Sequence, residues 1–236
     1  MWGTTGLGIN TKKVRAILGD GVPADSWALV FDPTISSKLK SCGISLMDDS
    51  TEVFAAALSY LGKDPNSIAM EDLDAAQALL VSARPNIRYF HSSQYISDLA
   101  NGDTCVAHAY SGDVLQARDR AAEANNGVVV GYIIPKEGAV LWVDVMTIPV
   151  DAPHPEQAMA FIDFMLTPSN IAAASNYVNY ANANSAATEL LDEGVRHDTG
   201  IYPPDAVMKK LFVLKQRSDK DNRSINRRWT RIKANR

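Results

Sequence analysis

Asp144 interrupts an apolar stretch, 139–148, that otherwise has the composition of a β-strand. Period-two alternation places Trp142 and Asp144 on the same face of that strand. Because burial of an unpaired charge is prohibitive, the carboxylate must be paired or must face a polar cleft. An aromatic ring beside a carboxylate suits an organic cation, since the ring face contributes about 0.5–2 kcal/mol and the acid accepts hydrogen bonds. A buried Asp144 paired with an arginine elsewhere is an equally good interpretation of this strand alone.

Two further acids lie at the starts of predicted helices. Asp113 ends the sequence Tyr110-Ser111-Gly112-Asp113, where a strand passes into a helix. Ligands of open α/β sheets bind beyond the carboxyl ends of strands, although an acid in a first helical turn also compensates the helix dipole. Glu52 ends the sequence Asp49-Ser50-Thr51-Glu52, which fits a capping box with Asp49 as the N-cap. That capping role is enough to explain Glu52 by itself.

The side chains that enzymes and metal sites require are not arranged in known patterns. The sequence has no G-x-S-x-G, H-E-x-x-H or C-x-x-C motif, and its four histidines are scattered. We therefore expect no catalytic residue, no metal site and no cofactor. Cys42 and Cys105 lie 63 positions apart, so they form either a disulfide in an oxidising compartment or two buried thiols.

The charges are unevenly distributed along the 236 residues, whose net charge is −4. Residues 207–236 carry a net charge of +9, which leaves a net charge of −13 for residues 1–206. Residues 203–215 and 222–234 both have the pattern of amphipathic helices, so the basic side chains are expected on their solvent-facing sides. No nucleic-acid-binding motif accompanies them, and we expect no nucleic-acid partner.

The helices and strands that must position these side chains alternate along the chain. The expected helices are 12–18, 49–61, 70–83, 93–100, 111–124, 156–166 and 168–176, and the expected strands are 28–31, 104–110, 128–134 and 139–148. This alternation predicts an α/β fold with a largely parallel sheet. The first ten residues lack the features of a secretory signal, and their three glycines indicate close backbone packing or a bend rather than a phosphate-binding loop.

Several blocks of residues, in order along the whole chain, carry a family resemblance. These blocks are Trp2-Gly3-Thr4-Thr5-Gly6, Leu61-Gly62-Lys63-Asp64-Pro65-Asn66-Ser67, Arg84-Pro85-Asn86-Ile87-Arg88-Tyr89-Phe90, Ala100-Asn101-Gly102-Asp103, Ile134-Pro135-Lys136-Glu137-Gly138 and Tyr180-Ala181-Asn182-Ala183-Asn184. Together they resemble the periplasmic polyamine-binding proteins of ABC transporters, particularly the putrescine and spermidine binders of Gram-negative bacteria.

The resemblance implies a type II periplasmic-binding-protein fold, a Venus flytrap whose lobes close over a linear polyamine and present it to an ABC permease. In this family carboxylates hold the ammonium groups and aromatic rings flank the methylenes. The matching positions in this chain are Glu52, Tyr110, Asp113, Trp142, Asp144 and Tyr180. Tyr110 departs from the tryptophan of some members, which would alter the preference for chain length. The resemblance also implies a periplasmic location.

The chain resembles only about the last two-thirds of a family member. By analogy, residues 1–9 form a crossover strand between lobes, residues 10–125 and 185–236 form a nearly complete carboxyl-terminal lobe, and residues 127–184 form a remnant of the amino-terminal lobe. We expect the strand over 139–148 to expose an apolar edge and face, which would favour self-association. The alternative to polyamine binding is a truncated, non-binding remnant that serves as an interaction or sensor module.

Overall fold

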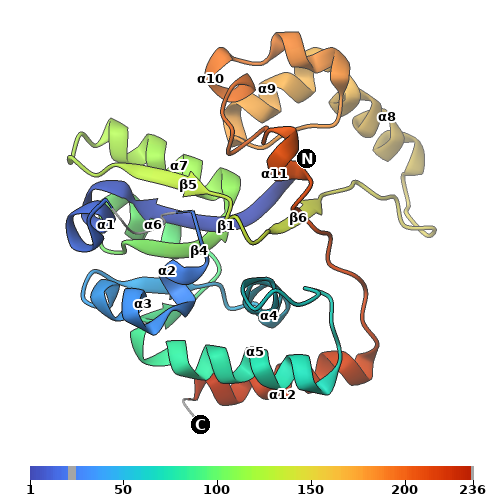
Figure 1. Cartoon of the computed structure of the whole chain (residues 1–236). Helices are drawn as coiled ribbons and strands as arrows, with labels where there is room; N and C mark the ends of the chain where they lie inside the picture. The colour runs from blue at the N-terminus through green and yellow to red at the C-terminus, as the bar shows by residue number, and fades with distance from the viewer. Residues whose placement is uncertain (21–24, 235–236) are drawn as a thin grey trace.

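The computed structural model describes residues 1–20 and 25–234, which form a mixed sheet covered by helices on both faces (Figure 1). The strands are β1 (Trp2–Asn10), β2 (Ile44–Leu46), β3 (Tyr89–Phe90), β4 (Val106–Tyr110), β5 (Val130–Ile133) and β6 (Val140–Val143). Their order is β3-β2-β4-β1-β5, and β6 pairs with the first half of β1. The long strand β1 is therefore the element on which the other parts of the sheet meet.

The prediction of a largely parallel sheet is wrong for β1. This strand runs antiparallel to β4, β5 and β6, and only the pairs β2–β3 and β2–β4 are parallel. Parallel neighbours need a crossover connection, but helices between two strands do not by themselves make those strands parallel. Helices connect β1 to β2, yet β1 lies between β4 and β5 and runs opposite to both.

Twelve α-helices are found in the described residues, together with the 3-10 turns η1 (Arg84–Asn86) and η2 (Ser185–Leu190). They are α1 (Thr11–Leu18), α2 (Ala28–Phe31), α3 (Pro33–Leu39), α4 (Ser50–Tyr60), α5 (Met70–Ala83), α6 (Tyr95–Asn101), α7 (Ser111–Glu123), α8 (Pro155–Leu166), α9 (Pro168–Val178), α10 (Glu193–Arg196), α11 (Asp205–Met208) and α12 (Asp219–Lys233). One apolar cluster joins α1–α5 and α12 to the sheet, and a second joins α6 and α7 to its other face. All seven helices expected between residues 12 and 176 are present.

The segment 28–31 is the helix α2 rather than a strand. Its apolar side chains are almost completely buried, and periodicity cannot distinguish a fully buried helix from a fully buried strand. Side chains accept hydrogen bonds from the backbone N–H groups at the start of this helix. The Ser26 hydroxyl accepts a hydrogen bond from the Ala28 N–H at 3.0 Å, and the Glu137 carboxylate accepts one from the Trp27 N–H at 3.2 Å.

The strand expected over 139–148 is shortened to β6. Its last ladder pair joins Val143 to Trp2, and beyond that pair the Asp144 N–H donates to the Met1 carbonyl at 2.8 Å. On its other edge, the Leu141 N–H donates to the Phe212 carbonyl at 2.8 Å, and the Phe212 N–H donates to the Ala139 carbonyl at 3.1 Å. The edge expected to be unpaired is thus partly covered by the chain itself. The same pairing replaces most of the helix expected over 203–215, of which only α11 forms.

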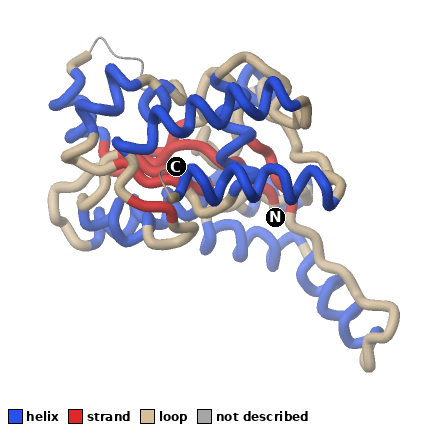
Figure 2. The backbone as a smooth tube through the Cα atoms, turned by 90° about the horizontal axis from the view of Figure 1, so that it is seen from below, coloured by secondary structure: helices blue, strands red, loops and turns tan. Residues whose placement is uncertain are grey.

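The apolar exposure expected of the segment 139–148 is present in its second half. Val143 and Val145 are 58% and 75% exposed. The helix α8 buries none of its residues, and Figure 2 shows it, with the loop that precedes it, extending away from the rest of the molecule. No helix among residues 1–20 and 25–234 combines the length and apolar character needed to cross a bilayer.

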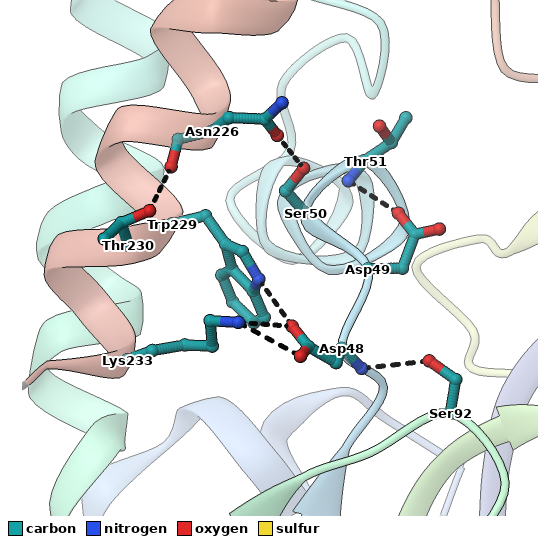
Figure 3. Close-up of polar contacts among 9 residues, drawn as sticks. All are labelled: Asp48, Asp49, Ser50, Thr51, Ser92, Asn226, Trp229, Thr230 and Lys233. Atoms are coloured by element: carbon teal, nitrogen blue, oxygen red, sulfur yellow. Dashed lines mark hydrogen bonds and ion pairs between the residues drawn. The ribbon is translucent and has the colours of Figure 1, made fainter.

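The basic carboxyl-terminal helix packs against the body of the protein, as its amphipathic pattern predicts. Ile225, Trp229 and Ile232 enter the larger apolar cluster, and α12 lies beside α5 (Figure 1). Figure 3 shows the polar contacts at its end, where the Trp229 indole N–H and the Lys233 ammonium donate to Asp48 at 2.9 and 2.8 Å. The apolar side of this helix is therefore buried against the body of the protein, as its sequence pattern predicts.

The two cysteines form a disulfide. Cys42 and Cys105 have Cα atoms 5.5 Å apart, within the usual range for bonded cysteines, and the bond ties the segment between α3 and β2 to the residue before β4. Of the two interpretations left open by the sequence, the structure selects the disulfide.

Candidate functional site

A hollow of about 370 Å³ gathers the predicted site residues from distant parts of the chain. Its lining consists of Glu52, Tyr110, Trp142, Asp144 and Tyr180, five of the six positions expected from the sequence. These side chains belong to α4, the end of β4, β6, the residue after β6 and the segment after α9. A second hollow of about 400 Å³ lies beside α1, but its lining is mainly aliphatic and includes the ion pair between Arg15 and Asp20.

Aromatic rings form one wall of the 370 Å³ hollow. The Trp142 ring lies between two tyrosines, with its centroid 5.7 Å from that of Tyr110 and 5.1 Å from that of Tyr180. Both pairs meet edge to face, the arrangement that aromatic quadrupoles favour. Gly3 makes room for the indole, because a Cβ atom at that position of β1 would lie 2.5 Å from the ring. The early glycines thus serve close packing, as the sequence indicated.

Glu52 is a buried carboxylate directed toward β1 rather than toward its own helix N-terminus. Asp49 caps α4 as predicted and accepts hydrogen bonds from the Thr51 and Glu52 N–H groups. The reciprocal capping-box bond is not formed, because Glu52 Oε1 instead accepts from the Thr5 hydroxyl at 3.3 Å. Its Oε2 has no hydrogen-bond partner among the described residues. The capping role therefore does not account for this side chain.

The surroundings of Glu52 raise its pKa from 4.5 to about 7. Burial is the main cause, because it penalises the charged form, and the nearby Asp49 carboxylate adds repulsion. The hydrogen bond from Thr5 acts in the opposite direction but is too weak to reverse them. A cation placed beside Glu52 would favour the ionised form that burial disfavours.

Asp144 is exposed and leaves the sheet immediately after β6. Its N–H donates to the Met1 carbonyl at 2.8 Å, which fixes the backbone at this point. The interpretation of Asp144 as a buried acid paired with an arginine is wrong. None of the ion pairs among residues 1–20 and 25–234 includes Asp144, Asp113 or Glu52.

Asp113 lies behind the aromatic wall and does not line the hollow. Its Oδ1 accepts a hydrogen bond from the Tyr180 hydroxyl at 3.0 Å, and its Oδ2 accepts one from the Tyr95 hydroxyl at 2.7 Å. Burial, together with the Asp113 charge, raises the pKa of both tyrosines, so both hydroxyls stay protonated and act as donors. The sequence identified Asp113 but gave no sign of Tyr95, which belongs to no motif. Thr5 belongs to the first family block, but no role in the site was assigned to it.

The composition of the lining favours binding over catalysis. Acids and aromatic rings line the hollow, and no histidine, serine or cysteine that could act as a nucleophile or base joins them. His108 is buried in the core, where desolvation lowers its pKa to about 3 and keeps it neutral. No group of three potential metal ligands occurs in the part of the chain that the structure describes. Carboxylates without basic partners, combined with flat apolar rings, suit an organic cation with apolar segments.

Comparison with known proteins gives matches along nearly the whole chain. Residues 2–201 match the model of a family described as bacterial extracellular solute-binding protein. The putrescine-binding periplasmic protein PotF of Escherichia coli is 53% identical over 235 residues, which are 99% of this chain and 64% of that protein. The putrescine-binding periplasmic protein SpuD of Pseudomonas aeruginosa is 50% identical over 234 residues, again 99% of this chain and 64% of that protein.

Solved structures support the same relationship. A putative spermidine/putrescine ABC transporter protein from Listeria monocytogenes has a TM-score of 0.83 and 30% identity, over 100% of this chain and 68% of that one. The spermidine/putrescine substrate-binding protein PotD from Streptococcus pneumoniae has a TM-score of 0.80 and 27% identity, over 99% and 67%. The predicted fold class is thereby confirmed. The chain spans about 64% of the length of these curated relatives.

Proposed function

This chain belongs to the bacterial extracellular solute-binding proteins, a family of binding proteins rather than enzymes, and from that premise we propose that it binds a linear polyamine. The proposed ligand is putrescine or spermidine, the compounds named for its curated relatives. Delivery of this ligand to the permease of an ABC importer, in the periplasm, belongs to the same proposal, because the named relatives are periplasmic and include transporter components.

One observation carries the proposal: the hollow combines two carboxylates without ion-pair partners and a wall of three aromatic rings. The carboxylates of Glu52 and Asp144 are the proposed acceptors for ammonium groups. The rings of Tyr110, Trp142 and Tyr180 are the proposed contacts for the methylenes, each of which contributes about 0.8 kcal/mol when it leaves water. In this proposal Asp113 acts from behind the wall, through Tyr180.

The proposal also includes the division of the chain into lobes. Residues 1–9 are the proposed crossover strand, residues 10–125 and 185–236 the carboxyl-terminal lobe, and residues 127–184 part of the opposing lobe. The hollow lies where elements assigned to both lobes meet, since Glu52 and Tyr110 come from the first group and Trp142 and Asp144 from the second. A ligand at this position would contact both lobes, which is what closure of a two-lobed binding protein requires.

Calorimetric titration of the chain with putrescine, spermidine and 1,4-butanediol tests the proposal. The diol has the carbon chain of putrescine without its charges, so we expect binding of the two amines and no binding of the diol. Asp144→Asn is expected to weaken putrescine binding at least about tenfold, because it removes a charge-assisted contact. Asp163→Asn, which changes an exposed acid on α8, is the matched control. Equal affinities for the diamine and the diol, or no binding of either amine, would contradict the proposal.

The alternative function is a non-binding interaction module, and one observation favours it. Met159, Phe161 and Phe164 are each more than half exposed on α8, a helix without a buried residue. Exposed apolar patches of this kind mark association surfaces. Sedimentation would then show self-association that Phe161→Ser and Phe164→Ser abolish, and no polyamine would bind. A stable monomer that does not bind a hydrophobic dye would exclude this alternative.

A further inference from the structure

Tyr95 places a hydroxyl group at the back of the candidate site from an otherwise apolar position. It is the first residue of α6, it is fully buried, and its ring packs in the cluster that contains Leu99 and Val114. Its hydroxyl donates to Asp113 Oδ2 at 2.7 Å. The same hydroxyl oxygen lies 3.5 Å from the Tyr110 N–H, which donates to it. One buried hydroxyl thus contacts both the end of β4 and the first turn of α7.

The Asp113 carboxylate is held at both of its oxygens. Tyr95 donates to Oδ2, and Tyr180 donates to Oδ1 at 3.0 Å. A carboxylate fixed by a donor on one oxygen presents its other oxygen in a defined direction. Loss of the Tyr95 donor would free the carboxylate to rotate, and the bond to Tyr180 would lose its geometry.

The Tyr180 ring is confined on two further sides. It lies over the first turn of α7, where a Cβ atom at Gly112 would lie 2.5 Å from the ring. Its centroid is 5.1 Å from that of Trp142. The Tyr180 ring is therefore confined by its packing against Gly112 and Trp142. The hydrogen bond from its hydroxyl to Asp113 adds a polar contact to this packing.

We propose that Tyr95 is a positioning residue of this site: through Asp113 it holds the Tyr180 ring against Trp142 and so fixes the aromatic wall. Tyr95 does not line the hollow and does not touch the ligand in this scheme. The inference rests on the proposed function, because it concerns the wall that would receive the methylenes. It assigns a binding role to a buried side chain that would otherwise be taken for part of the core.

A double-mutant cycle separates this role from a contribution to folding alone. The dissociation constant for putrescine is measured by calorimetry for the unmodified chain, Tyr95→Phe, Tyr180→Phe and the double variant. Each phenylalanine keeps the ring and removes only the hydroxyl. We expect Tyr95→Phe to weaken binding by about two- to tenfold, the effect of one hydrogen bond. In the Tyr180→Phe background the same change should cost less than about twofold, since the link is already broken.

Tyr89→Phe is the matched control. The Tyr89 hydroxyl also donates to an aspartate, Asp98, at 2.5 Å, but it lies away from the hollow. Its removal should leave the dissociation constant unchanged even where it lowers stability. Carbon-13 NMR of labelled tyrosines adds a measurement without ligand, in which the Tyr180 signal should shift in Tyr95→Phe and not in Tyr89→Phe.

The outcomes are distinct. Unchanged affinity in Tyr95→Phe, or equal fold-losses in both backgrounds, overturns the positioning role while the proposed function stands. A Tyr180 signal that does not respond to Tyr95→Phe also overturns it. Failure of the unmodified chain to bind putrescine overturns the proposed function and, with it, the role assigned to Tyr95.

Discussion

Replacement of Glu52 by glutamine should change how the stability of the chain depends on pH. The pKa of Glu52 is raised to about 7 in the folded chain, from 4.5, mainly by burial. Between these two values the folded state holds a proton that the unfolded state has released. The free energy of unfolding therefore falls as the pH rises through this window, which is the reverse of the behaviour of a carboxylate whose pKa is lowered by a partner.

The magnitude follows from the size of the shift. One pKa unit corresponds to 1.36 kcal/mol, so a raised pKa of this size costs the folded state about 3 kcal/mol once Glu52 is fully ionised. Glutamine has nearly the same shape and carries no charge at any pH. The stability of Glu52→Gln relative to the unmodified chain should consequently rise by about 2 kcal/mol between about pH 5.5 and about pH 8.

Urea denaturation at a series of pH values measures this difference, because other titrating groups contribute equally to both proteins. Glu123→Gln, at an exposed position at the end of α7, controls for the loss of a charge. A stability difference for Glu52→Gln that stays constant with pH would contradict a pKa of Glu52 that burial raises. The same proton competes with an ammonium group, so putrescine binding should weaken below about pH 7, by at most tenfold per pH unit.

Three further predictions concern packing and stability, and urea denaturation measures each of them. Gly112→Ala should lower the free energy of unfolding by about 1–3 kcal/mol, because its methyl group would collide with the Tyr180 ring. Gly194→Ala, where a Cβ atom meets nothing, should leave the free energy of unfolding unchanged. Equal effects of the two substitutions would contradict the close packing of Tyr180 on Gly112. Reduction of the disulfide should cost about 2–4 kcal/mol, since it closes a loop over a separation of 63 residues, and a variant with serine at both cysteines should not respond to reductant. Trp229→Phe should cost about 1.5–3 kcal/mol through loss of the indole donor shown in Figure 3, and no loss would mean that this contact does not anchor α12.

The local elements were predictable from the sequence because local signals determine them. The cap at Asp49 lies where the sequence places it, and the left-handed Gly102 ends α6 close to the predicted boundary at residue 100. The errors arise where distant residues decide the conformation. The ladder between β6 and β1 stops at the pair Val143 and Trp2, and Phe212 is extended because it pairs with β6. Neither pairing has a signature within the segment itself.

For the site as well, only some of the residues could be predicted from the sequence. Five of its six predicted residues line one hollow, although residue types and spacing alone left Asp144 and Asp113 open and explained Glu52 as a helix cap. The blocks of residues that resemble the family, rather than periodicity, indicated that these three acids belong to one site. Tyr95 was not predictable by either route, because a tyrosine at the start of a helix is usually part of the core. Only the distance between its hydroxyl and Asp113 suggests the positioning role proposed for it.

The proposed function requires that the ammonium charges and the linear apolar segment of a ligand be recognised together in this hollow. Its most direct test is a calorimetric titration of the unmodified chain with putrescine at about pH 8, where Glu52 is ionised, repeated in an excess of 1,4-butanediol. We predict a saturable binding isotherm for putrescine that the diol does not change. The absence of heat from putrescine, or its displacement by the uncharged diol, would contradict the claim.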